Sequence, residues 1–223
     1  MLPVSSIGKK IVMAVTGCCL VLFLLVHLLG NLSIYGGPGS LNAYAEFLHS
    51  KPTLLWIARL GLIGLFVLHV IFGLWLYIGN WVARPHRYVR ETTLQATLSS
   101  RTMIWTGALI LIFLAYHLAH LTLRWLYFPG ERFDAMGRFD EFFMVTSGFK
   151  NTSVMGAYVV VMLIFWMHLR HGASSLFQTL GFSHFKYEKI LTCLGIIIAT
   201  LIVGGCVSIP FLIWSGVIGG NAL

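Results

Sequence analysis

Acidic residues are scarce in this sequence. Asp and Glu together number 7 among 223 residues, and charged residues of both signs make up only 10% of the chain. A soluble domain carries about 25% charged residues. The long apolar stretches contain no acid before Glu188. Because a membrane-spanning helix needs about 20 apolar residues, the composition indicates an all-α integral membrane protein.

Five membrane-spanning helices are predicted within a single transmembrane domain that covers residues 1–223. Their approximate ranges are 11–32, 53–81, 101–126, 152–171 and 190–214. The first apolar stretch has no small-x-small cleavage site after it. We therefore interpret it as a span and not as a removed signal peptide.

Most of the basic residues lie in the loops or at the ends of the spans, and the formal net charge is +8. This distribution is typical of membrane topology and argues against nucleic-acid binding. Positive charge gathers at the N-terminus and in the loops 84–101 and 170–189. By the positive-inside rule these segments face the cytoplasm, which predicts a cytoplasmic N-terminus and an external C-terminus. The sequence also lacks a Cys-x-x-Cys-His motif, which excludes covalent c-type haem attachment.

What the first four apolar stretches do contain is one deep histidine each: His27, His69, His117 and His168. At about 1.5 Å per residue, His27 lies roughly 24 Å and His117 roughly 21 Å from the cytoplasmic end of its helix. The other two helices run in the opposite direction, so His69 and His168 come near the inner face. The depths therefore predict an outer pair and an inner pair.

Two imidazoles at equal depth on facing helices can be the axial ligands of a haem. The two pairs predict two b haems, held by the first four helices as a haem-binding bundle. Since both axial positions of each iron are filled, the predicted role is electron transfer. The alternative use of such histidines is hydrogen bonding between helices.

Two further histidines, His120 and His171, compete as ligands with His117 and His168. Each lies one turn away on almost the same helix face, so depth does not separate the members of either couple. A repeated pattern, Thr-Gly-x9-His-Leu, ends at His27 and at His117 and favours His117.

These features resemble the five-helix, di-haem cytochrome b membrane anchor of succinate:quinone oxidoreductases, which are succinate dehydrogenases or fumarate reductases. The resemblance covers essentially the whole chain. It rests on Thr16-Gly17-x9-His27, Asn42-Ala43-Tyr44-Ala45, Ser100-Arg101-Thr102, Thr106-Gly107-x9-His117-Leu118-x-His120, and His168-Leu169-x-His171-Gly172 followed by Phe177-Gln178-Thr179-Leu180-Gly181.

The resemblance implies that His27 and His117 bind the outer haem and that His69 and His168 bind the inner one. It implies a bacterial cytoplasmic membrane and partner subunits on the cytoplasmic face, a flavoprotein and an iron–sulfur protein. Lys9, Lys10 and the loop 84–101 are the candidate docking surface. The family also allows a dimer of the whole complex, surrounded by membrane lipid.

The resemblance further implies a quinone substrate, menaquinone in the di-haem type, near the outer haem. Some members use a glutamate just after the first span as the proton acceptor from the quinol, and Glu46 is the only acid in that loop. Other members carry a glutamate two residues before the fourth-span ligand, on a transmembrane proton path. Here that position is Trp166, which puts proton-compensated turnover in doubt.

Two other functions fit parts of the pattern. The cytochrome b subunits of membrane hydrogenases and formate dehydrogenases space their histidines differently and lack the tail at residues 177–181. A transporter or proton channel with a histidine relay would be expected to carry intramembrane acids or symmetric broken helices, which the spans lack.

Overall fold

The computed structural model describes residues 5–83, 97–126, 129–182 and 185–220. Within these residues, five helices are long and apolar enough to cross a membrane, as predicted. The helices are α1 (Ser6–Asn31), α2 (Pro38–His49), α3 (Pro52–Val82), α4 (Leu98–His117), α5 (Glu141–Phe149), α6 (Thr152–Thr179) and α7 (Phe185–Trp214), with a 3₁₀ turn at Leu32–Gly36 and a π-helical turn at Leu118–Thr122.

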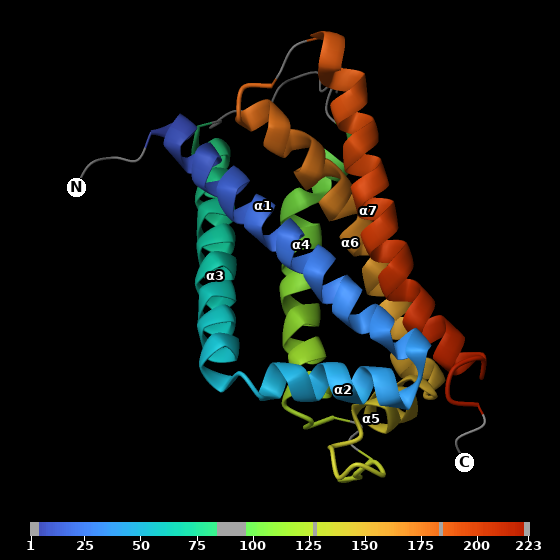
Figure 1. Ribbon diagram of the computed structural model, residues 1–223. Helices are drawn as coiled ribbons and strands as arrows, with labels where there is room; N and C mark the ends of the chain where they lie inside the picture. The colour runs from blue at the N-terminus through green and yellow to red at the C-terminus, as the bar shows by residue number, and fades with distance from the viewer. Residues whose placement is uncertain (1–4, 84–96, 127–128, 183–184, 221–223) are drawn as a thin grey trace.

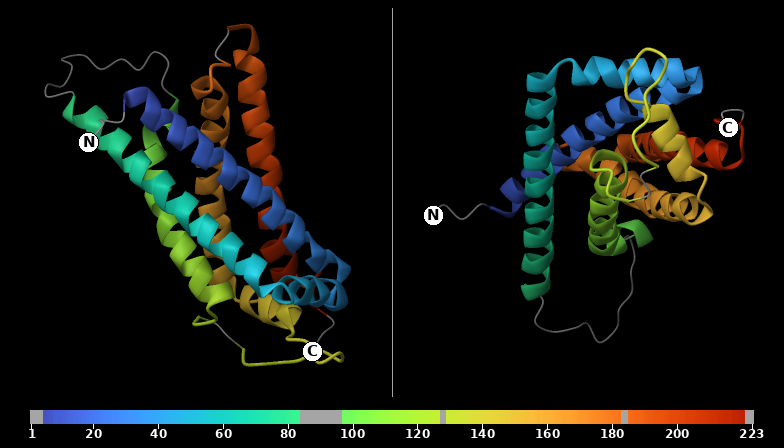
Figure 2. Two further views of the ribbon diagram at one scale, coloured as in Figure 1. Left: turned by 60° about the vertical axis from the view of Figure 1, so that its left-hand side comes forward. Right: turned by 90° about the horizontal axis from the view of Figure 1, so that it is seen from below.

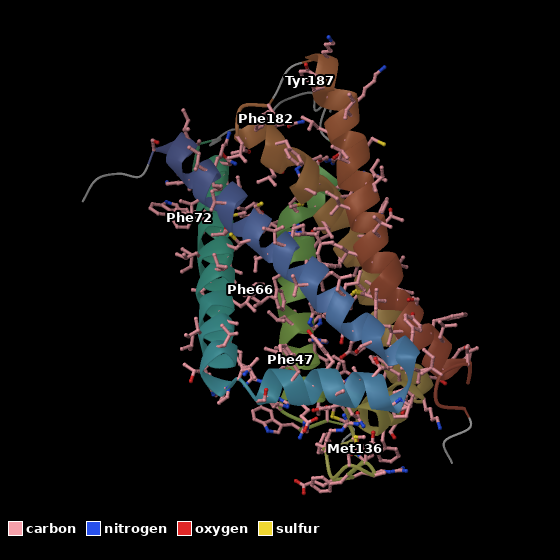
Figure 3. The ribbon with its side chains drawn as sticks, viewed as in Figure 1. Phe47, Phe66, Phe72, Met136, Phe182 and Tyr187 are labelled. Carbon is pink, nitrogen blue, oxygen red and sulfur yellow. The ribbon has the colours of Figure 1, made fainter. Side chains whose placement is uncertain are left out.

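The long helices run between two ends of the molecule (Figure 1), and the short helices α2 and α5 lie across the end that holds the C-terminus. Two further views show the same arrangement (Figure 2). Phe47 and Met136 lie at this end, whereas Phe182 and Tyr187 lie at the opposite one (Figure 3). We call the end with α2 and α5 the α2/α5 end, and the other the N-terminal end.

The packing couples the long helices in pairs. Helix α1 packs along α3 and also against α6, and α4 packs along α6. Helix α7 lies against the back of α6 and also contacts α1. The main buried apolar cluster joins α5, α6 and α7 near the α2/α5 end; its members are Ile34, Leu41, Phe142, Phe149, Val154, Tyr158, Ile209, Ile213 and Ile218. Through Tyr158 this cluster reaches the histidine-bearing helix α4, where Phe113 and Tyr116 pack against it.

The helix starts follow ordinary capping chemistry. Asn151 Oδ1 accepts the backbone N–H groups of Ser153 and Val154 at the start of α6 (2.9 and 3.3 Å), and Thr97 Oγ1 accepts that of Ser100 at the start of α4 (3.1 Å). Gly37 has a φ of 81°, which glycine adopts without strain, and α2 begins directly after it.

The structure differs from the predicted ranges at several places. The first and last spans begin earlier, at Ser6 and Phe185, and the third, predicted to reach 126, ends with the π-helical turn at Thr122. Helix α6 continues to Thr179, well beyond the predicted end at 171. The prediction followed apolar length alone, and the last two turns of the helix are more polar than the span before them.

The segment between the third and fourth predicted spans contains a short helix that no span predicted, α5, which Asp140 caps by accepting the N–H of Phe143 at 3.0 Å. The mixed charges before Asp140 conceal this short helix in a hydropathy profile.

Candidate functional site

His27 on α1 and His117 on α4 face each other. Their ring centres are 6.0 Å apart, and the rings are nearly perpendicular. Two imidazoles on opposite sides of one metal, each with a metal–nitrogen distance of about 2 Å, have ring centres about 6 Å apart. The separation of this pair therefore fits two axial ligands of a single metal centre.

His69 and His168 each meet a Thr-Gly dipeptide on the neighbouring helix. The Nδ1 atom of His69 lies 3.1 Å from Thr16 Oγ1, and that of His168 lies 3.0 Å from Thr106 Oγ1. A Cβ atom placed on Gly17 would lie 3.3 Å from Cε1 of His69, and one on Gly107 would lie 3.3 Å from Cε1 of His168. The two inner histidines thus occupy matching sites on α1 and α4.

The Thr-Gly dipeptides also fix the relative depth of the two layers. Each threonine precedes the histidine of its own helix by eleven positions, in α1 and again in α4. At about 1.5 Å per residue, eleven positions correspond to roughly 16 Å along the helix axis. His69 and His168 lie at the level of the threonines that they contact. The four histidines therefore lie in two layers, with His27 and His117 nearer the α2/α5 end.

His120 points away from the outer pair. Its ring is 3% exposed and packs against Phe149 and Tyr158, with ring centres 5.7 Å away in both cases. Its Nδ1 lies 3.0 Å from the Tyr158 hydroxyl, and its Nε2 lies against Gly148, where a Cβ would be 2.7 Å away. The π-helical turn that begins at Leu118 changes the helix register directly after His117. His117 is the one of the two that faces His27, whereas His120 lies against Gly148 and Phe149.

Tyr158 is a neighbour of the outer pair that the sequence spacing does not mark. Its hydroxyl lies 3.3 Å from Nδ1 of His117 as well as 3.0 Å from Nδ1 of His120. It is a tyrosine in an apolar stretch of α6, and a buried hydroxyl of this kind needs a hydrogen-bond partner. From the sequence one could therefore expect Tyr158 to have a hydrogen-bond partner, but not which histidine that partner is.

The residues near His168 divide between two sides of α6. Trp166 faces α7, where its Nε1 donates a hydrogen bond to Thr200 Oγ1 at 3.0 Å. Arg170 places its guanidinium 5.0 Å from the Trp166 ring and donates to Ser99 Oγ at 3.1 Å. His171, the other candidate of this helix, is half-buried at the next turn, while His168 contacts Thr106.

A polar network ties α2 to the segment before α5. Asn42, 1% exposed, donates to Asp140 Oδ1 (3.1 Å) and Asp134 Oδ2 (3.4 Å) and accepts the N–H of Phe142 (3.0 Å). Arg138 pairs with Asp134 at 2.8 Å. Desolvation alone would raise the pKa of Asp134, but hydrogen bonds from Arg138, Met136 and Asn42 outweigh it and lower the pKa to about 2. Asp134 is therefore ionised at neutral pH.

Glu46 lies on α2 at the edge of this network. Its side chain is 60% exposed, and its carboxylate lies 3.7 Å from a guanidinium nitrogen of Arg138. The structure therefore places Glu46 at the α2/α5 end, the end toward which His27 and His117 lie, with a cation beside it. Its role as a proton acceptor stays a prediction.

The candidate docking surface is only partly described. Lys9 lies on α1 at the N-terminal end, 3.8 Å from the centre of the Trp75 ring of α3. Of the loop 84–101, residues 84–96 lie outside the described part of the chain. Comparison with known proteins found no matching family, no curated relative and no similar solved structure.

Proposed function

We propose that this chain is the membrane anchor and electron-transfer subunit of a succinate:quinone oxidoreductase, carrying two b haems. The observation that supports it best is the pairing of His27 with His117 across 6.0 Å, together with a second, matching layer at His69 and His168. The family assignment itself comes from the sequence resemblance, and succinate oxidation or fumarate reduction would take place on the partner subunits.

The number of protein donors favours haem over a bare metal ion. Within the described residues, nowhere do three His, Cys, Asp or Glu side chains come together as a metal site. Each layer offers two imidazoles, which suits a metal whose other positions are filled by a macrocycle. A haem with two histidine ligands exchanges single electrons and has no open position for substrate.

The proposed division of labour follows the two layers. His69 and His168 would hold the haem nearer the N-terminal end, where positive charge predicts the cytoplasm and the flavoprotein and iron–sulfur subunits. His27 and His117 would hold the haem nearer the α2/α5 end, beside a quinone site. In this arrangement the helices supply fixed ligand positions about 16 Å apart along the axis, and electrons pass between quinone and the partner subunits.

The test of the proposal is a haem count on the complex purified through a tag on this chain. A pyridine haemochrome assay is expected to give two non-covalent b haems per chain, reducible by succinate or oxidisable by fumarate. Two haems without either reaction would assign the chain to another membrane redox complex. A chain without haem would exclude electron transfer and favour hydrogen bonding between helices as the role of the histidines.

Replacing Glu46 by glutamine is expected to slow electron exchange with quinone by about 100-fold, the scale of a lost general base. The neutral amide no longer accepts a proton, while the haem count stays at two because α2 does not carry a ligand. The measurement is quinone-coupled turnover of the purified complex together with its haem content. Glu131→Gln is the matched control, since Glu131 is an exposed acid of the same end. Equal turnover in both variants would remove Glu46 from the quinone site.

A further inference from the structure

The two Thr-Gly dipeptides begin the repeat Thr-Gly-x9-His-Leu that ends at His27 and His117, but the histidines they contact are His69 and His168. Thr16 and Gly17 meet His69, and Thr106 and Gly107 meet His168 in the same way. The first contact joins α1 to α3, and the second joins α4 to α6. The two helices of each pair pack against each other. The same local solution occurring twice is unlike an accidental contact.

The hydrogen bonds of the threonines fix the direction of the contact with histidine. Thr16 Oγ1 lies 2.8 Å from the carbonyl of Val12, and Thr106 Oγ1 lies 3.1 Å from the carbonyl of Thr102, so each hydroxyl donates within its own helix. A hydroxyl has one hydrogen and two lone pairs. With its hydrogen given to the carbonyl, the oxygen accepts from the histidine, and we infer from this arrangement an imidazole hydrogen on Nδ1 and a ring lone pair on Nε2.

The glycine after each threonine keeps the histidine ring close to the helix. At both sites a Cβ atom would come within 3.3 Å of Cε1, the ring carbon between the two nitrogens. A methyl group there would push the ring sideways and lengthen the threonine–histidine hydrogen bond. Threonine and glycine therefore act together: one sets the proton and the angle of the ring, and the other sets its distance from the helix.

We propose that Thr16–Gly17 and Thr106–Gly107 are positioning residues that hold His69 and His168 as Nε2 ligands and tune the potential of the inner haem. This inference rests on the proposed function. An acceptor on Nδ1–H raises the basicity of a ligating imidazole and fixes its orientation. A more basic ligand stabilises the oxidised iron, so each threonine lowers the potential of the inner haem and leaves the outer one alone.

The experiment is an optical redox titration of the complex in the wild type and in Thr16→Val and Thr106→Val. Valine has nearly the same shape and no acceptor. We expect the reduction potential of the inner haem to rise by up to about 59 mV, which corresponds to a tenfold change in its one-electron reduction equilibrium. The components are assigned with His69→Ala, which removes the inner haem, and His27→Ala, which removes the outer one.

Two further variants separate the hydrogen bond from simple packing. Thr16→Ser keeps the acceptor and is expected to keep the wild-type potential. Thr102→Val is the matched control, because Thr102 Oγ1 donates to the carbonyl of Leu98 at 2.9 Å in the helix of Thr106 and contacts none of the histidines in the described residues. It is expected to change neither haem. Gly17→Ala and Gly107→Ala are expected to lower the content of the inner haem and to leave the outer haem in place.

The outcomes separate this inference from the function on which it rests. In one outcome, the wild-type complex contains two haems while both valine variants keep the wild-type potentials and haem content. That result would overturn the positioning role and leave the proposed function standing. A shift of the outer haem, or an equal shift in Thr102→Val, would also overturn it. A wild-type complex without haem would overturn the proposed function, and the positioning role would fall with it.

Discussion

Replacing His117 with alanine is expected to leave one haem per chain instead of two, whereas replacing His120 leaves both. His117 faces His27 across 6.0 Å, so its removal takes away half of the outer ligand pair. His120 points instead toward Gly148 and Phe149 of α5. The measurement is the haem-to-protein ratio of each purified variant, with the low-spin spectrum of the remaining haem.

The His120 variant needs a companion because its ring is buried. His120→Ala leaves a cavity beside Phe149 and Tyr158 and lowers stability by about 2–4 kcal/mol, the usual cost of a large-to-small change in a core. His120→Gln retains a hydrogen-bonding group for Tyr158 and is the gentler variant. If His120→Gln lost one haem while His117→Ala kept two, the ligand assignment on α4 would be reversed.

Replacing Asn42 by alanine is expected to detach the α2/α5 end from the helices and to lower stability strongly. The change leaves the buried N–H of Phe142 without its acceptor and removes a donor from Asp140. A buried group left unsatisfied costs about 1–3 kcal/mol, and the Phe142 N–H is such a group, whereas Asp140 still accepts the N–H of Phe143. For a chain of this size a loss of about 1–3 kcal/mol corresponds to a fall in melting temperature of about 2–12 °C. Thermal unfolding of the solubilised complex measures it.

Asn151→Ala is the matched control for this experiment. Asn151 is an exposed asparagine that also accepts backbone N–H groups, as the cap of α6. Loss of such a cap costs about 1 kcal/mol. Because Asp134 stays ionised down to a pH of about 2, the effect of Asn42→Ala should be the same at pH 5 and pH 8. An Asn42→Ala protein no less stable than Asn151→Ala would show that the network adds little.

The membrane-spanning helices were predictable because one physical quantity decides them. Apolar length alone gives five helices, and the structure has five helices of that kind. The same holds for relative depth: a fixed rise per residue places His27 level with His117, and the structure brings these two rings together. Regular helices transmit such spacing without help from tertiary contacts.

The details that were missed depend on departures from a regular helix or on contacts between helices. His120 and His117 both reach the Tyr158 hydroxyl, as neighbours one turn apart can. Only His117 faces His27, however, and His120 packs against Phe149 after the π-helical turn at Leu118–Thr122. The Thr-Gly dipeptide was interpreted as a marker for the histidine further along its own helix. In the structure it contacts a histidine of the next helix, 53 positions away for Thr16 and 62 for Thr106. No spacing rule within one helix contains that information.

Helix α3, which carries His69, is the helix of the inner layer with the most surface left for the surrounding lipid. None of its residues is buried within the protein. With 31 residues it is about 46 Å long, whereas the hydrocarbon core of a bilayer is about 30 Å thick. Exposed Trp56 and Trp81, roughly 37 Å apart along the axis, suit the two headgroup regions. A helix longer than the hydrocarbon core accommodates a change in bilayer thickness by tilting, and the contact between His69 and Thr16 lies on the α1–α3 interface that such a tilt would shift.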